Sequence, residues 1–138
     1  MIEFIQSNLL LVVLTITSGG MLLWPMLNPS GAKELSPTDA TLLINRENAL
    51  FVDVRSPAEF SSGHVADAIN IPREKLIERI AELEKFKDRP LILNCASGVR
   101  SGSACADLRK QGFEKVFSLA GGMNAWLQAG LPLKKGHK

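Results

Sequence analysis

The sequence predicts an α/β protein built on a parallel sheet, with helices on both faces and one transmembrane helix in front. Two observations predict the sheet: short apolar runs recur along the chain, and a helical pattern separates most of them. A third observation predicts the transmembrane helix, because no charged residue occurs from Phe4 to Ala32. Ligand sites in such sheets form outside the carboxyl ends of the strands.

Residues 1–32 are predicted to be a membrane anchor that ends in a short linker, Asn28 to Gly31. Leu, Val, Ile and Met are dense from Leu9 to Leu27, and about 20 apolar residues span a bilayer core. Trp24 suits the membrane interface. No basic residue precedes the apolar run and no small-residue cleavage site is evident, which favours an uncleaved anchor over a signal peptide.

Charge is distributed unevenly along the chain. All sixteen Lys and Arg residues lie from Lys33 onward, and the positive-inside rule then places the C-terminal domain in the cytoplasm. We therefore expect a single-pass protein whose active site lies close to the membrane, with a membrane protein as a possible partner. The formal net charge of +2 is too small to indicate nucleic acid as a partner.

Residues 33–138 are predicted to form one domain with a short basic C-terminal tail. Its first helix begins at Ser36, an N-cap residue followed by Pro37, and the same capping pattern recurs from Ser56 to Glu59. A longer helix is expected from Arg73 to Phe86, where apolar residues recur at helical spacing. Further elements are predicted as strands over residues 50–54, 68–71, 91–93 and 116–119, a helix over 101–110, and a last helix from Gly121 through Trp126.

Cys95 is the candidate nucleophile. It follows the short strand Leu91 to Leu93 and opens a tight loop that leads through Arg100 into a helix. A thiolate placed there is stabilised by backbone N–H groups, by the positive end of the helix dipole and by the guanidinium. The alternative is an ordinary buried cysteine, and the loop position, Gly98 and Arg100 favour the nucleophile.

The second cysteine, Cys105, falls inside the helix after the loop and is interpreted as a small core residue. Two cysteines without a C-x-x-C pattern are too few for a disulfide framework or a zinc site. We therefore expect no metal.

Three blocks of the sequence resemble the rhodanese family of sulfurtransferases. The first runs from Asp53 to Pro72, the second is the loop from Cys95 to Ser101, and the third begins at Gly121 and ends at Pro132. The resemblance covers residues 33–133. It implies a rhodanese-like α/β/α sandwich around a five-stranded parallel sheet, and the anchored form is similar to small rhodaneses of the bacterial inner membrane.

The resemblance also implies the chemistry. Cys95 would carry a persulfide sulfur, taken from a small donor such as thiosulfate or a persulfide and passed to a thiol or cyanide acceptor, without a cofactor. Arg100 would bind an anionic donor and favour the thiolate. The loop lacks the additional basic side chains of the better-known thiosulfate enzymes, so thiosulfate need not be the preferred donor. The remaining residues of the anion-binding loop are Ala96, Ser97, Gly98, Val99 and Ser101.

Other polar residues are interpreted as structural. Asp53, Arg55 and Glu59 are expected to form an ion-pair and capping network, in which Asp53 and Arg55 could support the site. His64 is expected to be a hydrogen-bonded structural histidine, and Trp126 a core residue.

Two other functions remain open from the sequence. Cysteine phosphatases also hold an anion in a Cys-to-Arg loop, but they place five residues between the two, whereas four separate Cys95 from Arg100 here. A smaller loop suits one sulfur atom better than a phosphate. The second alternative is a membrane-tethered protein-interaction module on the same fold, against which the presence of Cys95 argues.

Overall fold

We analysed a computed structural model of the chain, which describes residues 1–27 and 33–136, with the backbone alone at 25–27. It divides into two compact units, residues 1–31 and 32–138, and each is described by itself. The predicted linker, Asn28 to Gly31, lies outside the described residues.

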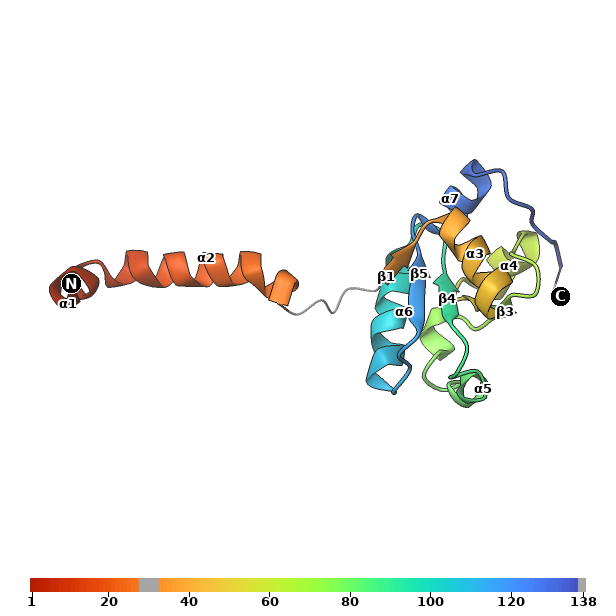
Figure 1. The fold of residues 1–138 in the computed structure, drawn as a ribbon, viewed down its shortest axis with the longest axis horizontal. Coiled ribbons are helices and arrows are strands. Elements are labelled where there is room, and N and C mark those ends of the chain that lie inside the picture. The colour runs from red at the N-terminus through yellow and green to blue at the C-terminus, as the bar shows by residue number, and fades with distance from the viewer. Residues whose placement is uncertain (28–32, 137–138) are drawn as a thin grey trace. The chain divides into compact units, whose positions relative to one another are not determined.

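The second unit contains the predicted parallel sheet (Figure 1). All neighbouring strands pair in parallel, in the order β1-β5-β4-β2-β3. Four of the five strands were predicted, and β1 was not. It contains the charged residues Lys33 and Glu34, so no apolar run indicated it in the sequence. The strands are β1 (Lys33–Leu35), β2 (Leu50–Asp53), β3 (Ile69–Asn70), β4 (Leu91–Asn94) and β5 (Val116–Leu119).

Helices cover both faces of the sheet, as predicted. One core cluster joins the sheet to residues of α5 and α6, and a second joins it to α3 and α7. Trp126 lies in the second cluster. Its ring contacts that of Phe51 edge-on, with 5.4 Å between the ring centroids. Helices of this unit are α3 (Pro37–Glu47), α4 (Pro57–Ser62), α5 (Ala81–Glu84), α6 (Val99–Lys110) and α7 (Gly122–Gln128).

The two predicted helix starts are confirmed. The Ser36 hydroxyl accepts a hydrogen bond from the backbone N–H of Asp39 at the start of α3. At α4, the Ser56 hydroxyl accepts from the N–H of Glu59, and the Glu59 carboxylate accepts in return from the N–H of Ser56. This reciprocal capping fixes the direction in which α4 leaves the sheet.

The predicted helix from Arg73 to Phe86 is wrong as one continuous element. The segment forms a 3₁₀ turn, Arg73–Lys75, further turns, and the short helix α5. Most of its backbone hydrogen bonds join residues three apart, as in the bond from Leu83 N–H to Ile80 C=O. The apolar spacing is nevertheless used, because Leu76 and Leu83 are fully buried against the sheet.

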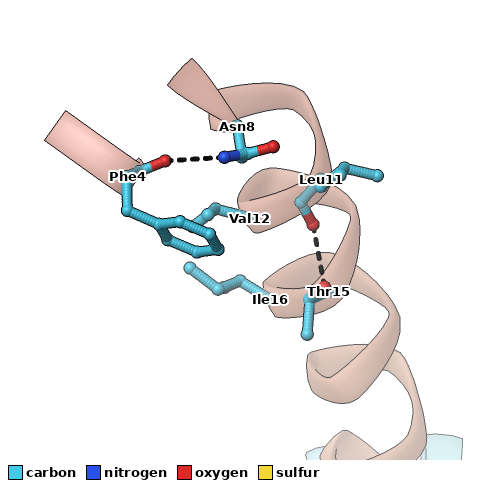
Figure 2. A pocket seen from close by; sticks show the side chains of 6 residues that line it. All are labelled: Phe4, Asn8, Leu11, Val12, Thr15 and Ile16. Atoms are coloured by element: carbon cyan, nitrogen blue, oxygen red, sulfur yellow. Dashed lines mark hydrogen bonds between the residues drawn. The ribbon is translucent and has the colours of Figure 1, made fainter. Parts of the chain in front are cut away.

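The first unit consists of α1 (Ile2–Ser7) and α2 (Leu9–Leu27). Asn8 separates them with φ −121° and ψ 30°, and its side-chain amide donates to the Phe4 carbonyl at 3.0 Å (Figure 2). A shallow hollow between the helices is lined by Phe4, Asn8, Leu11, Val12, Thr15 and Ile16. Most of the large apolar side chains in this unit are exposed.

The prediction of a transmembrane anchor over residues 1–32, and with it that of a single-pass inner-membrane protein facing the cytoplasm, is wrong. Within residues 1–27 and 33–136, no helix is both long and apolar enough to cross a bilayer. The predicted apolar stretch does form one helix, α2, but the hydroxyl-bearing residues and glycines within Thr15–Gly20 make its middle less apolar.

Candidate active site

The candidate site begins where β4 ends. β4 lies between β5 and β2, and each of its residues is buried. Cys95 follows directly, with only 1% of its surface exposed. The chain then turns at Gly98, whose φ of +101° is in the left-handed region, and enters α6 at Val99. Cys95 therefore sits where a parallel sheet commonly forms its ligand sites.

Three groups of the loop surround the Cys95 sulfur. The backbone N–H of Gly98 donates to Sγ at 3.0 Å, and the N–H of Ser101 donates at 3.4 Å. The Ser101 hydroxyl oxygen lies 3.5 Å from Sγ. The N–H of Ser101 belongs to the first turn of α6, where N–H groups have no partner within the helix. The loop thus aims several donors at one sulfur atom.

These donors determine the ionisation of Cys95. Burial raises the pKa of the thiol, but hydrogen bonds from the Ser101 hydroxyl and from the N–H groups of Ser101, Gly98 and Ser97 outweigh burial and lower the pKa below its ordinary value. Hydrogen bonds to the charged form of an acid favour that form. The arrangement consequently favours a thiolate at Cys95.

The first turn of α7 packs against the Cys95 loop. The N–H of Met123 donates to the Cys95 carbonyl at 2.8 Å, and the N–H of Asn124 donates to the Ala96 carbonyl at 3.1 Å. Gly122 makes this approach possible, because a Cβ atom on it would lie 2.3 Å from the Cys95 carbonyl oxygen. The sequence indicated this contact only through the third block of the resemblance.

Arg100 pairs with Glu59 of α4. Its two terminal nitrogens each lie 3.2 Å from a different oxygen of the Glu59 carboxylate. The hydrogen bond from Arg100 lowers the pKa of Glu59 to about 2, against the opposing effect of burial, and Glu59 raises that of Arg100. The guanidinium thus joins the loop to α4, a contact that the sequence did not predict.

Asp53 and Arg55 form a buried ion pair at the end of β2. Arg55 Nη2 lies 2.7 Å from Asp53 Oδ2 and donates to the Gly63 carbonyl at 2.6 Å. His64 is also buried, with its Nδ1 2.9 Å from the Phe60 carbonyl and its ring stacked on that of Phe60. The contact from Arg55 to Gly63 binds the C-terminal end of α4 to the end of β2.

The remaining loop residues differ in exposure. Ala96 is half-buried, Ser97 is exposed, and Val99 is 78% exposed. Sequence reasoning missed Ser118 of β5, whose hydroxyl lies 2.7 Å from that of Ser101. The one available signal was a lone hydroxyl inside an apolar strand, which strand patterns alone do not distinguish from a chance serine.

The fold and the site define an α/β/α protein with a thiolate loop at the carboxyl end of a central strand. The family model of the rhodanese-like domain matches residues 36–129. The chain belongs to the rhodanese-like domain family.

Relatives in this family include named sulfurtransferases. A sulfurtransferase from Allochromatium vinosum is 42% identical over 91 residues, which cover 66% of this chain and 83% of that protein. The thiosulfate sulfurtransferase GlpE of Shewanella oneidensis is 35% identical over 100 residues, 72% of this chain and 97% of that protein. The crystal structure of a rhodanese-related protein from Thermoplasma volcanium superimposes with a TM-score of 0.67 at 30% identity, covering 74% of this chain and 97% of that one.

Proposed function

We propose that the protein is a sulfurtransferase in which Cys95 carries the transferred sulfur. The observation that supports this most directly is the pair of backbone N–H groups, those of Gly98 and Ser101, that donate to Sγ. A thiolate is the nucleophilic form of cysteine, and these donors favour it. The sulfurtransferase names of relatives in the same family agree with the proposal.

The reaction divides into two displacements at sulfur. In the first, the Cys95 thiolate attacks the sulfane sulfur of the donor, and the bond from that sulfur to the rest of the donor breaks. Sulfite leaves with the electron pair when thiosulfate is the donor, and a thiolate leaves when the donor is a persulfide. In the second, an acceptor thiolate or cyanide attacks the outer sulfur of the Cys95 persulfide and releases the Cys95 thiolate. No external oxidant or reductant is needed.

The loop backbone has the principal role in this mechanism. N–H groups of Gly98 and Ser101 stabilise negative charge on the sulfur in the manner of an oxyanion hole. Ala96, Ser97 and Val99 contribute backbone rather than side-chain chemistry. Because the loop is fixed by α6 and by the first turn of α7, its donors need little rearrangement during the reaction.

Arg100 is assigned a role in donor binding. Glu59 holds the Arg100 guanidinium beside the Cys95 loop. Arg100 and Cys95 also attract each other electrostatically. A cation at this place favours an anionic donor and the thiolate. Asp53 and Arg55 support the site indirectly, through the end of β2 and the C-terminal end of α4.

Intact mass spectrometry tests the proposal. Incubation with thiosulfate or a low-molecular-weight persulfide is expected to add about 32 Da, the mass of one sulfur. The added sulfur should be on Cys95, because Cys95 is the proposed nucleophile. Cys105→Ala is the matched control and should still gain the sulfur, whereas Cys95→Ser should not. Cyanide should then remove the mass and release thiocyanate.

Two results would contradict the proposal. One is a Cys95→Ser variant that still converts thiosulfate and cyanide into thiocyanate. The other is hydrolysis of an aryl phosphate by the wild type, lost in Cys95→Ser, without any persulfide formation. The second result would make the protein a cysteine phosphatase.

A further inference from the structure

Two buried serine hydroxyls form a chain of contacts that ends at the Cys95 sulfur. Ser118 Oγ is 2.7 Å from Ser101 Oγ, and Ser101 Oγ is 3.5 Å from Sγ. The exposed fractions of Ser101 and Ser118 are 0% and 1%. Ser101 belongs to α6 and Ser118 to β5, so the pair joins the active-site helix to the sheet.

Counting protons shows what the second hydroxyl does. Ser101 has one hydroxyl proton but three neighbours that accept one: Sγ, Ser118 Oγ, and the Gly98 carbonyl at 3.2 Å. If Ser101 donates to Ser118, its proton is unavailable to the sulfur. If Ser118 donates to Ser101, that proton is free to point at the sulfur.

The surroundings of Ser118 select the second arrangement. Within residues 1–27 and 33–136, the Ser101 oxygen is the one hydrogen-bond partner of the Ser118 hydroxyl. A buried hydroxyl whose proton has no acceptor is costly, so the Ser118 proton is directed at Ser101. A Cys95 thiolate then attracts the Ser101 proton, and the two hydroxyls polarise each other in the same direction.

We propose that Ser118 is a positioning residue, whose hydroxyl orients that of Ser101 toward the Cys95 thiolate. This inference rests on the proposed function only for its role in sulfur transfer. When the persulfide forms, negative charge moves to the outer sulfur and Sγ becomes a weaker acceptor. The Ser101 proton is then free to return to the Gly98 carbonyl, while Ser118 continues to donate to Ser101.

The test measures the thiol without requiring sulfur transfer. In a Cys105→Ala background, which leaves one cysteine, the rate of alkylation by iodoacetamide is recorded from pH 5 to pH 10. Ser118→Ala is expected to move the profile to higher pH and to slow alkylation at pH 6 by about three- to ten-fold, as expected for one hydrogen bond. Ser103→Ala, an exposed serine of the same helix, is the control and should leave the profile unchanged.

An isosteric pair separates orientation from packing. Ser118→Thr keeps the hydroxyl and should keep the wild-type profile, whereas Ser118→Val has the same shape without a hydroxyl and should behave like Ser118→Ala. Melting temperatures identify variants that have lost the fold. Equal profiles for the Thr and Val variants would overturn the proposal, and so would a wild-type profile for Ser118→Ala.

A double-mutant cycle shows whether the effect passes through Ser101. Ser101→Ala should shift the profile further than Ser118→Ala, and adding Ser118→Ala to Ser101→Ala should change nothing more. Independent, additive shifts would mean that Ser118 acts by another route, which would overturn the proposal. Failure of the proposed function would appear separately, as absence of the persulfide in the wild type.

Discussion

Cys95 and Cys105 are both buried, and nine residues separate them in one strand–loop–helix segment, yet their pKa values are shifted in opposite directions. Burial raises the pKa of Cys105 to about 12. Burial also acts to raise the pKa of Cys95, but hydrogen bonds from Ser101, Gly98 and Ser97 outweigh it and lower the pKa. Burial alone therefore raises the pKa of a cysteine thiol, whereas burial together with hydrogen-bond donors directed at the sulfur lowers it.

The difference arises from where each cysteine stands along the segment. Cys95 faces the first turn of α6, whose N–H groups have no acceptor within the helix and are free to bind a sulfur. Cys105 lies in the middle of α6, where backbone N–H groups are already bonded to carbonyls of the preceding turn. Its thiol packs in the core cluster with Leu108 and Ala104.

The largest expected effect is in alkylation. Because the pKa of Cys95 lies below 9.0 and that of Cys105 is about 12, far less Cys105 is ionised at pH 8. A lower-pKa thiolate is less nucleophilic, which offsets part of this difference, so Cys95 should react about 10²-fold faster or more. Peptide mass mapping after timed iodoacetamide treatment measures both rates in one sample. Similar rates in the folded protein would remove the contrast between the two cysteines.

Gly122→Ala should disturb Cys95 and leave Cys105 unaffected. The new Cβ would lie 2.3 Å from the Cys95 carbonyl oxygen, and the residue has a φ of +56°. Because backbone must move, we expect destabilisation of about 3 kcal/mol or more, together with a higher pKa for Cys95. Urea unfolding and the alkylation profile measure the two effects.

Gly130→Ala is the matched control for that substitution. Gly130 also has a positive φ, +73°, but no atom lies within 4 Å of its added Cβ. The expected destabilisation is therefore the backbone strain alone, about 1 kcal/mol. Equal destabilisation by the two substitutions would show that the contact between Gly122 and the Cys95 loop has no energetic importance.

Arg100→Ala should affect the two donor classes differently. Removing the guanidinium removes an attraction for anions and for the thiolate, so kcat/KM for thiosulfate should fall by about ten-fold. A neutral persulfide donor should lose less. Arg79→Ala removes a half-buried cation that is paired with Glu82, away from the Cys95 loop, and serves as the control. Equal losses with both donors would contradict an anion-binding role for Arg100.

The sequence predicted the parts of the fold that depend on local pattern. Strands β2, β4 and β5 are apolar runs, and α3 and α4 begin at capping signals, so each is visible within a few residues. β1 was not predicted because it is an edge strand in which Lys33 and Glu34 are exposed, so it is not an apolar run. The segment after Arg73 was read as one helix because turns and helices bury residues at similar spacing, as Leu76 and Leu83 do.

The site was predictable to the extent that it lies in one stretch of chain. Cys95, the loop and the start of α6 are consecutive, so the position of the thiol follows from the strand–loop–helix order. Contacts between distant segments could not be predicted from the sequence, because nothing in the local pattern links Glu59 to Arg100 or Ser118 to Ser101. The anchor prediction failed although α2 covers the predicted apolar residues, because the Thr, Ser and Gly residues within Thr15–Gly20 lower the apolar content of that helix.

The smallest expected effect is that of the ion pair between Glu59 and Arg100, beside the Cys95 loop. Hydrogen bonding by Arg100 lowers the pKa of Glu59 from 4.5 to about 2, so the folded protein binds a proton there less readily than the unfolded chain does. The pair therefore stabilises the fold fully above pH 4.5, and this stabilisation is lost as the pH falls through 4.5 and then 2. Because both side chains are about two-fifths exposed (41% and 39%), solvent screening limits the effect to about 1 kcal/mol or less.

Glu59→Gln isolates the charge, since a glutamine at this position keeps the side-chain oxygen that caps Ser56. The difference in unfolding free energy between the wild type and Glu59→Gln, measured in urea, should be largest at pH 7 and close to zero at pH 2. Glu82→Gln, which breaks an exposed pair away from the loop, is the control for the general effect of removing a carboxylate. A difference that stays constant from pH 7 to pH 2 would assign the effect of Glu59 to capping. The ion pair between Glu59 and Arg100 would then add nothing to the stability of the protein. The Cys95 loop, which has no counterpart around Cys105, would not depend on this pair.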